Sequence, residues 1–135
     1  MLISFLRSRQ AGHFQLQKMK ETLFSYGTLQ KENVQMKLFG KIFQSSTDTL
    51  KGFKTTTIEI RDESFISKGE EKFQQTLIAS TDNNDTVKGT VLELTTEELT
   101  LADKYEPDNY KRIQVILESG KKAWVYIATK INIPK

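Results

Sequence analysis

The 135-residue sequence contains no cysteine, one histidine and two prolines. Without cysteine the chain has no disulfide, no thiolate nucleophile and no thiolate metal site. The single histidine, His13, excludes a metal centre built from several histidines. We therefore expect no metal centre of either of these two kinds. The lack of cysteine also fits a reducing compartment, which favours a cytoplasmic location.

Long hydrophobic runs are also absent. No segment approaches the ~20 apolar residues that are needed to span a bilayer. The apolar stretch from Met1 to Leu6 is too short for the core of a signal peptide, and the charges of Arg7 and Arg9 follow it instead of preceding it. We expect neither a membrane anchor nor a membrane partner.

The composition is that of one globular domain, with 37% hydrophobic and 27% charged residues. The net charge of +3 invites a nucleic-acid hypothesis. However, the lysines are dispersed among acids, and adjacent basic residues occur only at 111–112 and 121–122. A nucleic-acid binder more often shows a clustered basic face with interleaved aromatic residues. We expect no nucleic-acid partner, and the sequence leaves the oligomeric state open.

The first 18 residues have no periodic apolar face. They form either a peripheral N-terminal arm or a stretch upstream of a true start at Met19. We expect residues 19–135 to make up a single domain.

Patterns of apolar and turn-forming residues predict an α+β fold with a mixed, largely antiparallel sheet and a few short helices. A helix over 31–39 is expected to end at Gly40, and a capping box at Thr95 and Glu98 starts a second helix that Pro107 ends. Gly89 inside a strand indicates a bulge or a close backbone approach. The expected strands are 22–26, 50–60, 73–79, 87–94, 112–117 and 123–128, the last two forming a hairpin.

One carboxylate, Glu106, stands out on the second helix. Leu99, Ala102 and Glu106 are spaced by three and four residues and share a helix face, so Glu106 is directed toward the apolar interior. Pro107 pushes Glu106 toward an extended backbone. A carboxyl in apolar surroundings has a raised pKa, which suits a general acid/base at cellular pH.

The spacing allows a plainer interpretation of the same residue. Glu106 could end a solvated helix, or pair with Lys104 or Arg112 on the surface. The sequence alone leaves both interpretations open.

A second candidate is the turn Tyr26-Gly27-Thr28-Leu29, which follows the first expected strand. Gly27 has no side chain to block a ligand, and the turn can direct successive N–H groups at a carboxylate or an oxyanion. The Thr28 hydroxyl can donate or accept a hydrogen bond. Alternatively, the glycine marks an ordinary turn and Tyr26 belongs to the core.

Four segments together resemble the gamma-glutamylcyclotransferase family, including its AIG2-like branch. The opening strand and turn at 24–29, the glycine-containing strand 87–94, the block at 98–112 and the closing strand 123–126 follow in the order typical of that family. The resemblance covers roughly residues 22–128. The sequence departs from the family pattern at Ala102, at Pro107 and in the region before Thr76. These departures affect the expected shape of the pocket more than its expected chemistry.

The resemblance implies a sheet that closes partly into a barrel. It also implies a reaction in which the α-amine of a γ-glutamyl amine or γ-glutamyl amino acid attacks its own γ-carbonyl and releases 5-oxoproline. Glu106 would be the catalytic general acid/base, and Tyr26, Gly27, Thr28 and Leu29 would bind the substrate. The alternative is a non-catalytic ligand-binding or interaction module of the same fold, because fold likeness does not guarantee activity.

Overall fold

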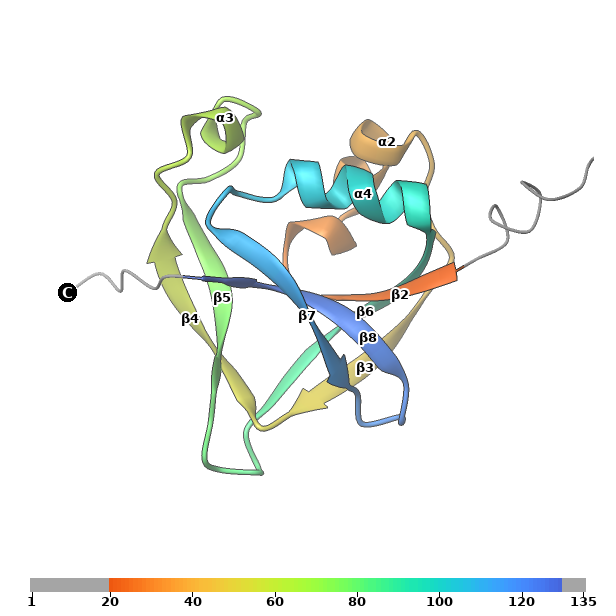
Figure 1. Ribbon diagram of the computed structural model, residues 1–135, viewed down its shortest axis with the longest axis vertical. Coiled ribbons are helices and arrows are strands. Elements are labelled where there is room, and N and C mark those ends of the chain that lie inside the picture. Colours follow the sequence, from red (N-terminus) through yellow and green to blue (C-terminus); the bar gives the residue numbers. More distant parts are fainter. Residues whose placement is uncertain (1–19, 130–135) are drawn as a thin grey trace, which may run out of the picture.

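The computed structural model describes residues 20–129, and its centre is a five-stranded sheet (Figure 1). All neighbouring strands in this sheet pair antiparallel except β2 and β8, which run parallel. In spatial order the strands are β3 (Ser45–Lys51), β6 (Thr86–Thr95), β2 (Lys20–Ser25), β8 (Lys122–Ala128) and β7 (Tyr110–Ile116).

A separate two-stranded sheet pairs β4 (Phe53–Glu59) with β5 (Phe73–Ala79). The helical elements are η1 (Thr28–Gln30), α2 (Glu32–Phe39), α3 (Glu63–Ile66) and α4 (Thr96–Tyr105). Figure 1 shows α2 and α4 over one face of the larger sheet, with α3 at the end of the β4–β5 hairpin. The α+β class with a mixed, largely antiparallel sheet is thus as predicted.

The barrel implied by the resemblance is not supported, because neither sheet in residues 20–129 closes on itself. The expected strand 50–60 is in fact two strands. Gly52, with φ of 80°, ends β3 in the left-handed region and sends β4 out of the main sheet. Side-chain hydrogen bonds join the two sheets instead: the Ala128 N–H donates to Thr76 Oγ1 at 2.9 Å, and the Tyr110 hydroxyl donates to the Gln75 carbonyl at 3.0 Å.

Several local predictions are confirmed. Gly40 ends α2 with φ of 75°, and the capping box joins Thr95 and Glu98 by both expected hydrogen bonds. Gly89 marks a close approach: a β-carbon there would lie 2.5 Å from the Ser25 carbonyl oxygen and 2.6 Å from the Phe24 ring. No other residue fits between β6 and β2 at this point without displacing Phe24.

Alternation along β2 divides the core between the two faces of the sheet. Leu23 faces the helices and packs in one apolar cluster with residues such as Leu92 and Leu99. Phe24 points to the opposite face and packs with Val91 and Val125. Because β2 is covered on both sides, its C-terminal end and the following turn are held rigidly by the core.

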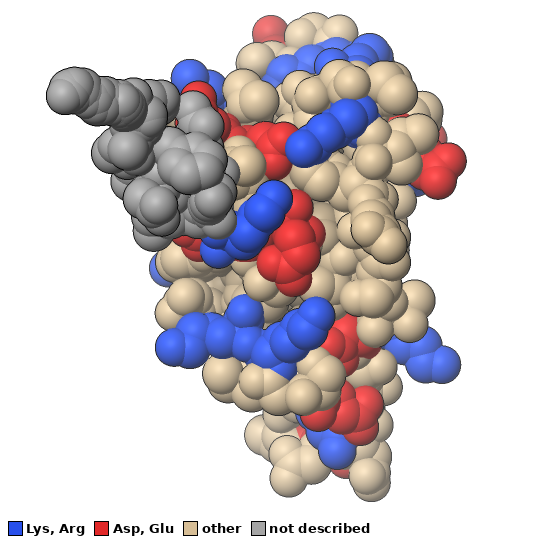
Figure 2. Space-filling view, turned by 90° about the vertical axis from the view of Figure 1, so that its right-hand side faces the viewer, with Lys and Arg blue, Asp and Glu red and all other residues tan. Residues whose placement is uncertain are grey.

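Charges of both signs are mixed on the face shown in Figure 2, where lysine and arginine side chains lie beside acidic ones. The ion pairs among the described residues include that of Lys41 with Glu98, at 2.8 Å. The expectation that the protein does not bind nucleic acid stays a prediction. None of the helices within residues 20–129 has the length and apolarity to cross a membrane. The prediction for residues 1–18 lies outside the described residues.

Candidate active site

The turn after β2 presents backbone N–H groups at the end of a buried strand. Gly27 has φ of −132°, and its carbonyl accepts from the Gln30 N–H at 3.3 Å, which forms η1. Within residues 20–129, the N–H groups of Thr28 and Leu29 make no hydrogen bond, as is usual at the start of a helical turn. The turn therefore has two N–H donors for an anionic group.

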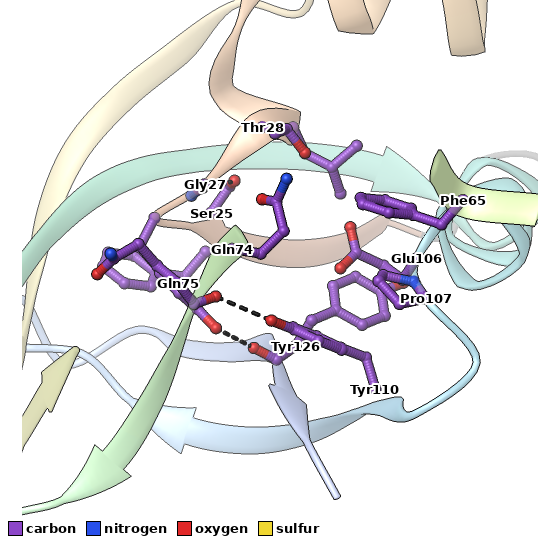
Figure 3. Close-up of a pocket in the computed structure, with 13 residues that line it drawn as sticks. Ser25, Gly27, Thr28, Phe65, Gln74, Gln75, Glu106, Pro107, Tyr110 and Tyr126 are labelled. Atoms are coloured by element: carbon purple, nitrogen blue, oxygen red, sulfur yellow. Dashed lines mark hydrogen bonds between the residues drawn. The ribbon is translucent and has the colours of Figure 1, made fainter. Parts of the chain in front are cut away.

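Glu106 lies at the C-terminal end of α4. Its N–H donates to the Ala102 carbonyl at 3.1 Å and closes the last helical turn, while its ψ of 153° is extended, as Pro107 predicts. Leu99 and Ala102 are 2% and 0% exposed, so the face that they share with Glu106 is buried. Figure 3 shows the Glu106 carboxylate pointing into the space between Thr28, Gln74 and Phe65.

These two features line the same pocket (Figure 3). Its walls come from the 24–29 segment, Phe65 of α3, Gln74 and Gln75 of β5, residues 106–107, and a tyrosine from each of β7 and β8. The space measures about 420 Å³ including its open mouth. The fold therefore brings Tyr26, Gly27, Thr28 and Leu29 together with Glu106, although about 80 residues separate them in the sequence.

The surroundings of Glu106 favour its neutral form. Burial of the carboxyl, reinforced by the nearby carboxylates of Glu70 and Asp103 and opposed by the Lys68 ammonium, raises the pKa of Glu106 to about 8. The residue as a whole is only half-buried because the carboxyl faces the pocket. We take burial as the main cause, since the walls of the pocket are largely aromatic and aliphatic.

The plainer interpretation of Glu106 as a paired surface acid is wrong. Arg112 instead binds Asp103 through two hydrogen bonds, of 2.8 and 3.1 Å. Within residues 20–129, Glu106 forms no ion pair with Lys104 or any other cation. The Glu106 carboxyl is therefore free to meet a ligand in the pocket.

Tyrosines form the opposite side of the site: Tyr126 is buried, and Tyr26 and Tyr110 are half-buried. The Tyr26 hydroxyl donates to the Tyr126 carbonyl at 2.6 Å, and the Tyr110 hydroxyl donates to the Gln75 carbonyl. Burial raises the pKa of Tyr26, Tyr110 and Tyr126 above the ordinary range. All three are therefore neutral at cellular pH, and they contribute hydrogen bonds and apolar surface without adding charge.

The sequence did not single out several pocket residues as site residues. Phe65 belongs to α3, a four-residue helix, whose one sequence signal is the capping pattern of Asp62 ahead of Ser64. Tyr110 lies on β7 and Tyr126 on β8, and the pairing of these strands brings both to the site. The hairpin predicted from the sequence gives the pairing of the two strands but not which of their side chains line a pocket. Gln74 and Gln75 carry no motif at all.

The site has the parts of a proton-transfer centre for a carboxylate-bearing substrate. It combines one acid that titrates near neutrality, two free backbone donors and a pocket lined by neutral groups. Within the described part of the chain, no group of three or more histidine, cysteine or acidic side chains is placed to hold a metal ion. Glu106, as the carboxyl that lines this pocket, offers acid–base chemistry.

Comparison with known proteins gives one family. The sequence matches the family model described as "Gamma-glutamyl cyclotransferase, AIG2-like" over residues 23–135. A search of curated proteins found no match.

Solved structures show the same fold. A structure described as a gamma-glutamyl cyclotransferase aligns with a TM-score of 0.66 at 16% identity, covering 84% of this chain and 69% of that one. A protein from Arabidopsis thaliana aligns with a TM-score of 0.63 at 18% identity, and the alignment covers 82% of this chain but only 63% of the plant protein. An uncharacterized protein from Homo sapiens aligns with a TM-score of 0.61 at 19% identity, and the alignment covers 84% of this chain and 69% of the human protein.

Proposed function

Because the chain belongs to the AIG2-like gamma-glutamyl cyclotransferase family, we propose that it cyclises a γ-glutamyl amine or γ-glutamyl amino acid to 5-oxoproline and releases the free amine. The observation that carries the proposal is the meeting of Glu106 with the turn at 26–29 in one pocket. The pocket thus pairs a group that can accept a proton with donors that suit a carboxylate.

Glu106 would move the protons of the reaction. Its carboxylate takes a proton from the α-ammonium of the substrate, and the resulting amine attacks the γ-carbonyl carbon of the same molecule. A C–N bond forms, the carbonyl oxygen becomes an oxyanion, and the tetrahedral intermediate collapses as Glu106 delivers the proton to the departing nitrogen. The bond to the leaving amine breaks, the ring nitrogen passes the second proton of the former α-ammonium to the Glu106 carboxylate and from there to the released amine, and 5-oxoproline remains.

The turn would hold the glutamyl part of the substrate. The free N–H groups of Thr28 and Leu29 suit its α-carboxylate, and the absence of a side chain at Gly27 lets the substrate approach the backbone. Once the α-amine and the γ-carbonyl are held together, ring closure gains from proximity. The nucleophile belongs to the substrate, so no step of this scheme requires a cofactor.

The raised pKa of Glu106 fits both halves of its role. A carboxyl with a pKa of about 8 is a stronger base than an ordinary glutamate, and it still carries a proton readily near neutral pH. The α-ammonium of a bound substrate would stabilise the carboxylate by its opposite charge. The transfer of a proton between Glu106 and the substrate then has a low free-energy cost.

A substrate panel tests the proposal. The full chain is incubated with γ-glutamyl amino acids and γ-glutamyl amines, and 5-oxoproline is measured. Formation of 5-oxoproline from at least one member supports the proposal and also identifies the leaving group. Calorimetric binding of 5-oxoproline with no turnover of any member would point to the non-catalytic binding module instead.

A further inference from the structure

The segment that joins β4 to β5 contacts the chain on both sides of Glu106. On the C-terminal side the contact is made by Asp62. One of its carboxylate oxygens accepts from the N–H groups of Ser64 and Phe65 and so caps α3, while the other accepts from the Asp108 N–H at 2.9 Å. The start of α3 is thereby fastened to the turn that follows Glu106.

On the N-terminal side, Lys68 and Glu70 both bind Tyr105, the residue before Glu106. The Lys68 ammonium donates to the Tyr105 carbonyl at 3.2 Å and lies 5.1 Å from the centre of its ring. The Tyr105 hydroxyl donates to a Glu70 carboxylate oxygen. A cation and an anion are therefore both held next to Glu106 through a single aromatic residue, Tyr105, which is buried.

The two charges have opposite effects on Glu106. The Lys68 ammonium favours its ionised form, and the Glu70 carboxylate disfavours it. We propose that Lys68 and Glu70 are positioning residues that hold Glu106 in place through Tyr105 and, by their opposed charges, set the pH range in which the site works. This inference rests on the proposed role of Glu106 as proton carrier.

The other groups around Glu106 are a carboxylate held in a hydrogen-bond network and a set of neutral phenols. Asp103 of α4 is engaged by Arg112 and also accepts from the Tyr126 hydroxyl at 2.6 Å. The remaining titratable neighbours are phenols whose pKa is raised, so they are uncharged between pH 6 and pH 9: Tyr26 after β2, Tyr105 of α4, Tyr110 of β7 and Tyr126 of β8. The Lys68–Glu70 pair therefore supplies the charges near Glu106 that can be changed one at a time without breaking the Asp103 network.

The first arm of the test measures kcat/KM against pH on a substrate found in the panel. Lys68→Met should shift the rising limb of this profile to higher pH by about 0.5–1 pH unit. Glu70→Gln should shift the same limb to lower pH by a similar amount. Lys68→Arg keeps the cation and should restore the profile of the unmodified protein. The α-ammonium of the substrate also titrates, but its contribution is the same for every variant.

Lys68 and Glu70 line a surface groove that is separate from the Glu106 pocket, and two of its other residues supply matched controls. Lys104→Met and Glu71→Gln make the same changes of charge beside Lys68 and Glu70, but neither group is among the charges that act on Glu106. Both controls should leave the rising limb unmoved. Control variants that shift the limb as far as the test variants would overturn the inference, because the effect would then come from net charge alone.

The second arm does not need turnover. The side-chain carboxyl carbon of Glu106 is followed by NMR in ¹³C-glutamate-labelled protein, and its signal is assigned by its loss in Glu106→Gln. Opposite shifts of the titration midpoint in Lys68→Met and Glu70→Gln support the inference, and coincident midpoints overturn it. Opposite NMR shifts without 5-oxoproline formation would overturn the proposed function and leave the opposed charges established. Where Lys68→Met does not fold, Lys68→Gln, which also removes the cation but keeps a donor for the Tyr105 carbonyl, takes its place and should raise the midpoint.

Discussion

At the scale of single residues, Glu106 combines a useful chemistry with a cost to stability. Its pKa of about 8 in the folded protein lies above its ordinary value near 4.5. An acid whose pKa is raised by folding contributes its full stability at pH values below its pKa in the unfolded chain. That stability is lost as pH rises from about 4.5 to about 8, because the unfolded chain ionises first.

Glu106→Gln should therefore be stabilised relative to the unmodified protein at high pH. We expect the difference in the free energy of unfolding between the two to grow by about 2 kcal/mol between pH 5 and pH 9, after allowing for partial solvent access. Urea unfolding at the two pH values measures this difference. A constant difference across the range would mean that Glu106 ionises in the folded protein as it does in water.

Gly27 is the residue at which binding can be separated from folding. A β-carbon added at this position meets no atom within 4 Å, and φ of −132° lies outside the left-handed region that favours glycine. We expect Gly27→Val to melt within a few degrees of the unmodified protein and to bind 5-oxoproline at least about tenfold more weakly. Melting curves and calorimetry measure the two effects.

Gly89→Ala provides the contrasting variant. Its β-carbon would collide with the Ser25 carbonyl and the Phe24 ring, so it should lose about 1–3 kcal/mol of stability. Wild-type affinity in folded Gly27→Val would place the ligand elsewhere in the molecule.

At the scale of elements, the sequence predicts best where a local signal decides the structure. The end of α2 at Gly40 and the start of α4 at Thr95 were predictable, because a left-handed residue and a capping box each act within one helical turn. The break at Gly52 was not, since a glycine between two β-rich stretches is compatible with one continuous strand as well as with two. Two contacts settle the matter: the Gly52 N–H donates to the Asp85 carbonyl, and the Ser80 N–H donates to the Gly52 carbonyl.

The residues of the candidate site also fall into those with a local sequence signal and those without one. Glu106 and the turn at 26–29 were predictable from helix spacing, a proline, a glycine and the family resemblance. Phe65, Gln74 and Gln75 were not, because they reach the pocket through the position of the β4–β5 hairpin, which long-range packing decides. For the same reason the sequence could not predict that side chains such as Thr76 join the two sheets without closing them.

The capping box of α4 offers a test of how firmly the helix presents Glu106. Thr95→Ala removes the acceptor for the Glu98 N–H at 3.1 Å and should cost about 1 kcal/mol. Thr100→Ala, in the exposed middle of the same helix, should change stability by less than about 0.5 kcal/mol. Thermal unfolding compares the two variants. Equal losses would show that the cap does not stabilise α4.

At the scale of the whole molecule, the family match begins at residue 23, and the sequence of residues 1–18 has no periodic apolar face. We therefore predict that a chain starting at Met19 folds and keeps the activity of the full chain. Melting curves of both chains, with light scattering for their mass, make the comparison. A large fall in melting temperature or a change of oligomeric state would assign the first 18 residues a structural role.

The account as a whole depends on Glu106 carrying a proton in the pocket. The most direct test is the rate of 5-oxoproline formation by the unmodified protein and by Glu106→Gln, with Glu97→Gln, an exposed acid in the first turn of α4, as control. Glutamine keeps the shape of the side chain and cannot accept the proton. The account predicts a loss of about 10²-fold or more in kcat for Glu106→Gln and an unchanged rate for the control. Turnover by Glu106→Gln at the rate of the unmodified protein would contradict it.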